Sequence, residues 1–155
     1  ITVIRGNASE IMALANSGAK TNSGAKTKGV DSSALSEDAL DAARRLHDTY
    51  GSVVCVSGET DYILAGADVT KVLNGHIMMT KVTGLGCTAS ALCGAFAAVN
   101  GNFALAASAA MAVMGIAGEM SAMNSPGPGS MQVNFLDALY RLSEENINKL
   151  LRIEG

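Results

Sequence analysis

The sequence predicts an α/β fold in which helices flank a mostly parallel sheet. A short apolar strand at residues 2–4 leads directly into a helical pattern that contains Glu10 and Ile11, and this strand–helix succession is typical of parallel sheets. A second apolar run, residues 52–57, is almost continuous, as expected for a strand covered by helices on both faces. Ligands bind such sheets at the carboxyl ends of the strands, so we examine those ends for functional residues.

Size and composition favour one packed domain over residues 1–155. Hydrophobic residues make up 48% of the chain and charged residues 16%, which disfavours disorder. The net charge of -3 disfavours nucleic acid as a partner. Three cysteines without a CxxC pair disfavour disulfides and structural zinc and favour the cytoplasm. The abrupt beginning on a strand suggests the C-terminal part of a larger domain, without its N-terminal portion.

The N-terminal elements are expected to alternate with polar turns. Residues 5–7 are predicted to turn out of the first strand, and Asn7 or Ser9 is predicted to cap the following helix. Residues 16–27 contain two copies of the sequence Asn-Ser-Gly-Ala-Lys-Thr. We expect them to form an exposed polar loop, because the repeat is polar and contains glycine. Phosphate binding by Lys20 or Lys26 is disfavoured, because no Walker pattern surrounds either lysine.

The central part of the chain predicts a helix, a strand and a hairpin. Ser36 is expected to cap an amphipathic helix that ends at residues 50–51. After the strand at 52–57, residues 61–64 and 69–73 are predicted to pair around a short turn.

Two long helices rich in alanine and glycine are predicted at residues 88–99 and 103–123, and a last helix follows the loop at 124–130. The second is nearly long enough to cross a membrane. Glu119 within it, and the absence of flanking basic loops, disfavour a membrane hairpin. We therefore expect no membrane partner and a core position for both helices.

The segment Lys-Val-Thr-Gly-Leu-Gly-Cys-Thr at residues 81–88 is predicted to open the first of these helices. A glycine turn at a helix start presents unpaired N–H groups at the positive end of the helix dipole, which suits phosphate. Cys87 would lie in the first turn, where the same field favours the thiolate. By itself the Gly-x-Gly spacing is equally compatible with a turn that serves only close packing.

The order of these motifs resembles the hydroxyethylthiazole kinase family of the ribokinase-like superfamily. The motifs are Arg-Gly-Asn-x-x-Glu at residues 5–10, Ser-Gly-Glu at 57–59, the segment at 81–88, the two apolar helices, and Gly-Pro-Gly-Ser at 127–130. The resemblance covers essentially the whole chain and implies a ribokinase-like α/β fold, of which this chain would be the C-terminal portion.

The resemblance also implies roles for individual residues. Arg5 and Ser57 match ATP-binding positions, although the family often has threonine at the position of Ser57. Asn7 and Glu10 match a pattern associated with Mg²⁺ and its water shell. Gly84 matches a glycine that contacts the thiazole. An anion hole would comprise Gly84, Leu85, Gly86 and Cys87. Cys87 stands where most ribokinase-like enzymes have a catalytic aspartate, and it would accept or orient the proton of the substrate alcohol.

The reaction implied by the resemblance is ATP- and Mg²⁺-dependent phosphorylation of the primary alcohol of 4-methyl-5-(2-hydroxyethyl)thiazole, in thiamine biosynthesis or salvage. The family assembles as a homotrimer, which would cover the apolar helices. Two alternatives stay open: another ribokinase-like kinase, acting on a hydroxymethylpyrimidine or a sugar, and a nucleotide-binding fragment that is inactive alone. Cys87 in place of aspartate disfavours the first alternative.

Overall fold

The structure is a computed structural model that describes residues 1–17 and 32–155. The tandem repeat at residues 16–27 therefore lies almost entirely outside the described residues, and so does the loop that we expect there. Side chains are described for residues 1–17 and 37–155.

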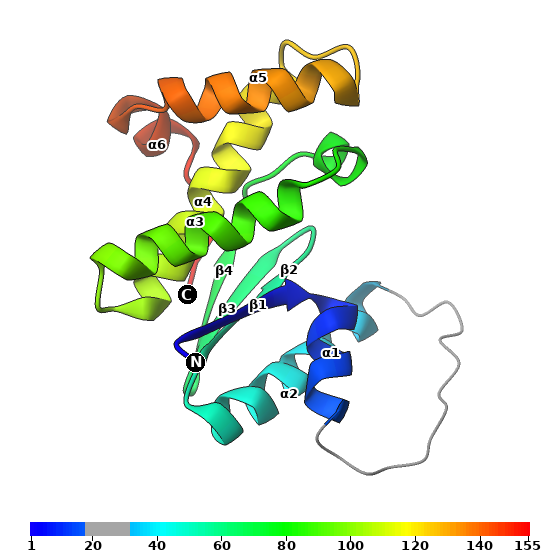
Figure 1. Ribbon diagram of the computed structural model, residues 1–155, viewed down its shortest axis with the longest axis vertical. Coiled ribbons are helices and arrows are strands. Elements are labelled where there is room, and N and C mark those ends of the chain that lie inside the picture. Colours follow the sequence, from blue (N-terminus) through cyan, green and yellow to red (C-terminus); the bar gives the residue numbers. More distant parts are fainter. Residues whose placement is uncertain (18–31) are drawn as a thin grey trace.

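The centre of the molecule is a five-stranded sheet with the strand order β1-β2-β3-β4-β5 (Figure 1). Its strands are β1 (Val3–Asn7), β2 (Val53–Ser57), β3 (Asp61–Ala65), β4 (Asp68–Val72) and β5 (Ile153–Glu154). Strands β1 and β2 are parallel, whereas the other neighbouring pairs are antiparallel. The α/β class is thus confirmed, but the sheet is mixed rather than mostly parallel in the described residues. The predicted hairpin is the reason, because a two-residue turn can join only antiparallel strands.

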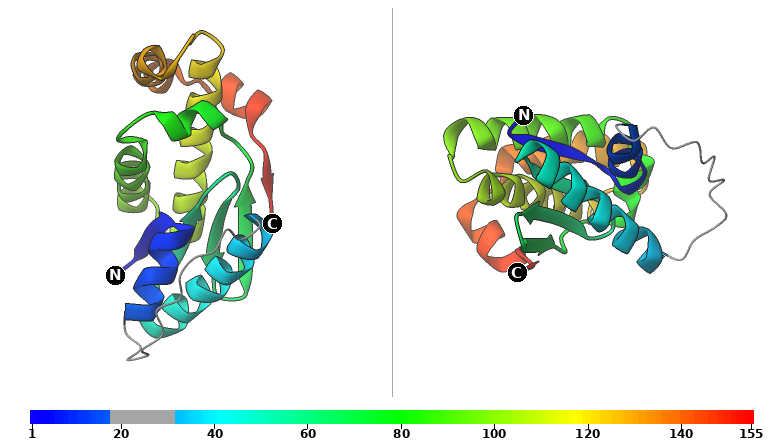
Figure 2. Two further views of the ribbon diagram at one scale, coloured as in Figure 1. Left: turned by 90° about the vertical axis from the view of Figure 1, so that its right-hand side faces the viewer. Right: turned by 90° about the horizontal axis from the view of Figure 1, so that it is seen from below.

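Helices cover both faces of this sheet (Figures 1 and 2). Its helices are α1 (Ala8–Ser17), α2 (Ser32–Tyr50), the 3₁₀ helix η1 (Ile77–Lys81), α3 (Leu85–Val99), α4 (Phe103–Ala122), α5 (Pro128–Arg141) and α6 (Glu144–Leu150). One core cluster joins β1, β2 and β3 to α1 and α2. The other joins the opposite face to α3, α4 and α5. The fold therefore has three layers: the sheet lies between α1 and α2 on one face and α3, α4 and α5 on the other.

Helix α4 occupies the centre of the second core, as its alanine-rich sequence predicts. In the described residues it is the one helix long and apolar enough to span a membrane by length and composition, and 61% of its most apolar 18-residue window is buried inside the fold. Small residues such as Ala107 and Ala110 are fully buried, because they allow neighbouring backbones to approach closely.

Several predicted boundaries were wrong. Residues 5–7 belong to β1 rather than to a turn, and α2 begins at Ser32 rather than after Ser36. Helix α3 begins at Leu85, three residues before its predicted start. Helix α6 and strand β5 were not predicted, because the sequence after residue 143 has no clear apolar period.

Candidate active site

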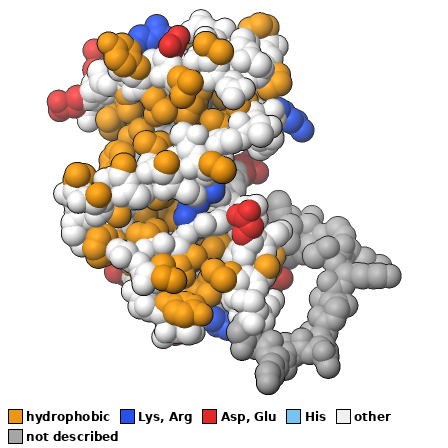
Figure 3. All heavy atoms as spheres, in the orientation of Figure 1, with side chains coloured by type: hydrophobic (Ala, Val, Ile, Leu, Met, Phe, Trp, Pro, Cys, Tyr) orange, Lys and Arg blue, Asp and Glu red, His pale blue; other side chains and the backbone are white. Residues whose placement is uncertain are grey.

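A cleft of about 820 Å³ opens at the carboxyl ends of β1 and β2. The segment after β4, the first turn of α3 and the middle of α4 form its other walls. Figure 3 shows a basic and an acidic side chain close together at the middle of this face, between two surfaces rich in apolar side chains. The position agrees with the general rule that α/β sheets bind ligands beyond the carboxyl ends of their strands.

Arg5 connects three parts of this cleft. Its Nη2 donates to Ser57 Oγ (2.7 Å), and its Nη1 donates to the carbonyl oxygen of Gly86 (2.9 Å). The Nε atom is buried and donates to no acceptor within the described residues. Strand β1 carries Arg5 and the parallel strand β2 carries Ser57, so the register of the sheet sets their separation. The guanidinium therefore stands where the strand ends meet α3.

The first turn of α3 presents the backbone donors that the glycine segment predicted. Gly84 precedes the helix with a φ of 92°, a left-handed conformation that glycine adopts without steric strain. Since Gly84 has no side chain to cap the helix, the N–H groups of Leu85, Gly86 and Cys87 lack partners within it. These groups and the helix dipole favour an anion beside Arg5.

Asn7 and Glu10 form a reciprocal cap at the start of α1. Asn7 Oδ1 accepts a hydrogen bond from the Glu10 N–H (2.9 Å), and Glu10 Oε2 accepts one from the Asn7 N–H (2.8 Å). This capping box accounts for both residue types without a metal. It also leaves Glu10 Oε1 without a protein donor in the described part of the chain, and an exposed carboxylate beside an amide oxygen suits a hydrated Mg²⁺.

The described ranges contain no group of three or more His, Cys, Asp or Glu side chains placed to hold a metal ion directly. Any Mg²⁺ near Asn7 and Glu10 would therefore keep much of its water shell, which is the usual habit of this ion at phosphate sites.

Cys87 and Gly84 lie on the outer side of the same turn. Both are exposed to solvent, and neither lines the cleft, whereas Leu85 and Gly86 do. The structure therefore brings Arg5, Ser57, Asn7 and the inner half of the predicted anion hole to one cleft. Glu10, Gly84 and Cys87 are exposed and stand outside the cleft lining.

Asp61 is a buried carboxylate of the cleft that sequence reasoning missed. Its Oδ1 accepts a hydrogen bond from the Gly58 N–H (3.0 Å) and thereby fixes the turn that follows Ser57. Burial raises the pKa of Asp61 to about 6, and the Gly58 hydrogen bond and the Arg5 charge only partly oppose that rise. The available signal was an acidic residue placed directly before the apolar run of β3.

Comparison with known proteins identifies the family to which this geometry belongs. A model of the hydroxyethylthiazole kinase family matches residues 1–145. The chain belongs to the hydroxyethylthiazole kinase family. Similar proteins named hydroxyethylthiazole kinase include those of Syntrophus aciditrophicus, 62% identical over 98% of this chain and 54% of the relative, and of Vibrio campbellii, 50% identical over 98% of this chain and 54% of the relative.

A solved structure of the family has the same fold. The hydroxyethylthiazole kinase protein of Pyrococcus horikoshii is 30% identical, with a TM-score of 0.83 over 99% of this chain and 54% of that one. The expected ribokinase-like α/β fold is thereby confirmed for this chain. The chain spans about half the length of the curated relatives that it matches.

Proposed function

We propose that this chain carries the nucleotide site of a kinase that phosphorylates the primary alcohol of 4-methyl-5-(2-hydroxyethyl)thiazole with ATP. The observation that carries this proposal is the Arg5 guanidinium, bonded to both Ser57 Oγ and the Gly86 carbonyl at the opening of α3. Family membership supports the choice of reaction. Phosphoryl transfer depends mainly on positioning and on charge stabilisation, and both are available at this junction.

The polyphosphate of ATP would lie between Arg5 and the first turn of α3. A guanidinium offers a planar fork of donors that matches phosphate oxygens. The backbone N–H groups of Leu85, Gly86 and Cys87 would stabilise charge on the transferring phosphoryl group. Ser57 would hold the Arg5 fork in place and offer its hydroxyl to the nucleotide.

Asn7 and Glu10 would hold Mg²⁺ through water, with Glu10 Oε1 as the available carboxylate oxygen. When bound, the ion would neutralise part of the charge on the phosphates. The capping box keeps both side chains at the carboxyl end of β1, the strand that also carries Arg5.

The acceptor alcohol would approach from the outer side of the α3 turn. Its oxygen would form a new bond to the γ-phosphorus as the bond to the ADP leaving group breaks, and Cys87 would accept or orient the proton released by the alcohol. Gly84 would contact the thiazole, since its backbone is open to solvent there. A thiol is a weaker permanent anion than a carboxylate, so we expect Cys87 to contribute less than an aspartate would.

Assembly and location follow the same reasoning. We propose a homotrimer, because the resemblance to the family implies one and because several large apolar side chains are exposed. We propose the cytoplasm as its location, because the three cysteines show no disulfide pattern. On α5 these are Val133, Leu136 and Tyr140.

Nucleotide binding without turnover is the second candidate. The observation that favours it is the position of Cys87 and Gly84 outside the cleft lining, which leaves the acceptor side unenclosed by the described residues. The test is ADP release from MgATP by this chain, with and without hydroxyethylthiazole and with hydroxymethylpyrimidine and sugar acceptors. Thiazole-dependent release supports the kinase, nucleotide binding without release supports the second candidate, and turnover with another acceptor overturns the proposed substrate.

A further inference from the structure

One wall of the cleft is a short segment that follows β4. This wall segment, residues 74–80, joins β4 to η1 and includes most of that short 3₁₀ helix. It supplies Asn74, Gly75, His76, Ile77, Met79 and Thr80 to the cleft lining. Its internal hydrogen bonds are all local; for example, the Met79 N–H donates to the His76 carbonyl (2.9 Å), the Met78 N–H to His76 Nδ1 (3.2 Å) and Thr80 Oγ1 to the Ile77 carbonyl (2.8 Å). These bonds shape the segment but do not attach it to the rest of the fold, so contacts from outside the segment set its position.

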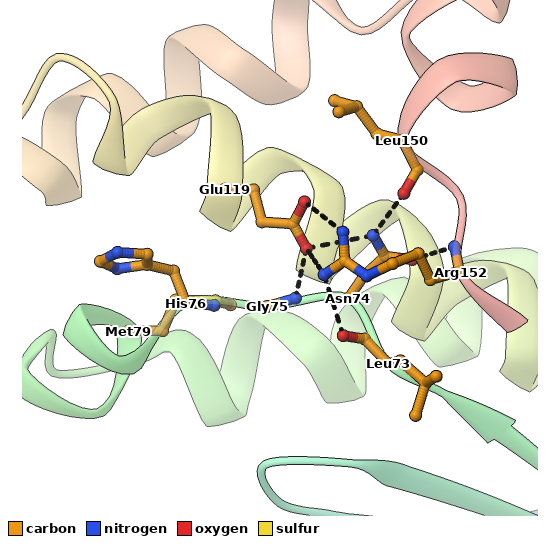
Figure 4. Close-up of polar contacts among 8 residues, drawn as sticks. All are labelled: Leu73, Asn74, Gly75, His76, Met79, Glu119, Leu150 and Arg152. Carbon is orange, nitrogen blue, oxygen red and sulfur yellow. Dashed lines mark hydrogen bonds and ion pairs between the residues drawn. The ribbon is translucent and has the colours of Figure 1, made fainter.

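Glu119 of α4 is the group best placed to do so (Figure 4). Its Oε1 accepts hydrogen bonds from the Gly75 N–H (2.7 Å) and from Asn74 Nδ2 (3.1 Å). The same oxygen accepts from Arg152 Nη2 (2.7 Å), and Oε2 accepts from Nη1 (3.2 Å). Burial alone would raise the pKa of Glu119, but the hydrogen bonds that it accepts outweigh burial and lower the pKa, so the carboxylate is charged at neutral pH.

Arg152 completes this Glu119 cluster (Asn74, Gly75, Glu119 and Arg152). Its backbone N–H donates to Asn74 Oδ1 (2.8 Å), and its Nη2 also donates to the Leu73 carbonyl (3.1 Å). Asn74 Nδ2 in turn donates to the Leu150 carbonyl (2.8 Å). The start of the wall segment is therefore held from two directions, by α4 and by the residues at the end of α6 and just before β5.

The surface of α4 is shaped to receive the same segment. A Cβ at Gly115 would lie 2.5 Å from the Asn74 carbonyl oxygen, and one at Gly118 would overlap the Met79 side chain. The contact at Gly115 is with backbone, so glycine there lets the segment lie against the helix, whereas the flexible Met79 side chain can move away from a Cβ at position 118. One turn of α4, residues 115–119, thus provides both the surface against which the wall segment packs and the carboxylate that binds it.

We infer that Glu119 is a positioning residue, which together with Arg152 holds the wall segment in the place where it contacts bound nucleotide. The inference rests on the proposed function of the cleft. Glu119 itself does not line the cleft and acts through Asn74 and Gly75, which do.

The test measures MgADP affinity by calorimetry and amide hydrogen exchange of the wall segment in the 155-residue chain. The variant Glu119→Gln keeps an acceptor for Gly75 but removes the charge that pairs with Arg152. Glu154→Gln is the matched control: it makes the same change at a carboxylate of β5, away from the Glu119 cluster, and breaks the exposed pair with Lys71 (3.7 Å). Arg152→Lys, on a side chain that is half-exposed, is the milder variant should Glu119→Gln fail to fold.

We expect Glu119→Gln to weaken MgADP binding about tenfold, because small displacements of positioning groups have large effects, and to speed exchange at Gly75 and Met79. Arg152→Lys should weaken binding less, and Glu154→Gln should match the wild type. Wild-type affinity within about twofold in folded Glu119→Gln, or equal effects of Glu154→Gln, would overturn the inference. Failure of the wild type to bind MgADP would instead overturn the proposed function, and the inference with it.

Discussion

At the scale of single residues, Arg5 is the side chain on which the proposed nucleotide site should depend most. Arg5→Ala should raise the Michaelis constant for ATP by about one to two orders of magnitude, because a hydrogen bond to a charged group contributes about 1.5–3 kcal/mol. The constant for the alcohol should change little. Steady-state kinetics with each substrate varied in turn provides the measurement, with Arg44→Ala, a surface arginine paired to Asp41, as the control. An unchanged ATP constant and turnover would remove Arg5 from phosphate binding.

Substitutions of Cys87 test its proposed role beside the acceptor alcohol. Cys87→Ala should lower kcat by about a hundredfold or less, the lower end of the range for acid–base groups, with little change in nucleotide affinity. Cys87→Asp should retain or exceed the wild-type rate, because a carboxylate is a permanent anion at neutral pH. Full activity of Cys87→Ala would show that the thiol takes no part in proton transfer.

Asp61 links the cleft to the pH dependence of stability. Its carboxyl has a pKa of about 6 when folded and an ordinary value of 3.8, so the folded state binds its proton more tightly than the unfolded state does. The contribution to stability is therefore full below about pH 3.8 and declines as the pH rises through about 6.

The substitution Asp61→Asn removes this titration while it keeps an acceptor for the Gly58 N–H. Between about pH 4.5 and pH 7, the free energy of unfolding of the wild type should fall by about 2 kcal/mol relative to the variant. Urea unfolding of both proteins across this range checks the result. Parallel curves for the two proteins would mean that Asp61 titrates near its ordinary pKa.

At the scale of elements, the contact between α4 and the wall segment makes a prediction about glycine. Gly115→Ala should destabilise the fold by about 1–3 kcal/mol, because its methyl group would meet the Asn74 backbone. Gly94→Ala on α3 is the control, since a Cβ there meets nothing within 4 Å and should stabilise the helix by about 0.5–1 kcal/mol. Thermal unfolding of both variants distinguishes them. Equal stabilisation by the two substitutions would contradict the close approach seen at Gly115.

The elements that could be predicted from sequence are those whose signals are local. The hairpin of β3 and β4 was found because apolar runs flank a short glycine turn, and α4 because small apolar residues predominate along its whole length. The turn predicted at residues 5–7 was wrong, because pairing with β2 extends β1 through Asn7. That pairing joins residues about fifty positions apart, which no local pattern reveals.

Some residues of the candidate site could likewise be predicted from sequence, and others could not. Arg5, Ser57 and Gly86 were predicted to lie together, because motif order and strand-end geometry specify that edge. The Glu119 cluster was missed, since its hydrogen bonds join residues 33 to 78 positions apart and no local pattern connects any of them. A lone carboxylate in a long apolar helix was the one available signal, because a charge in such a place requires a partner.

At the scale of the whole molecule, the exposed apolar stripe on α5 predicts self-association. Val133, Leu136 and Tyr140 are 63%, 62% and 91% exposed and follow the i, i+3, i+7 spacing of one helix face, so they offer an apolar surface to a partner. For the proposed homotrimer, sedimentation should give three times the 15.8 kDa mass of one chain, and Leu136→Lys should lower that mass. Gln132→Lys, on the same helix, is the control. An unchanged mass in Leu136→Lys would assign assembly to another surface.

The position of Arg152 also has a consequence for biosynthesis. The ribosome adds residues in order, so Asn74 and Glu119 are made well before the arginine that binds both of them. Contacts between distant positions form late in folding, because the intervening chain must first be ordered. A nascent chain that stops short of residue 152 can therefore build β1 to β4 and α4 and still lack a settled cleft wall. We expect such chains, stalled on the ribosome, to bind ADP, the proposed ligand, poorly until residue 152 has emerged.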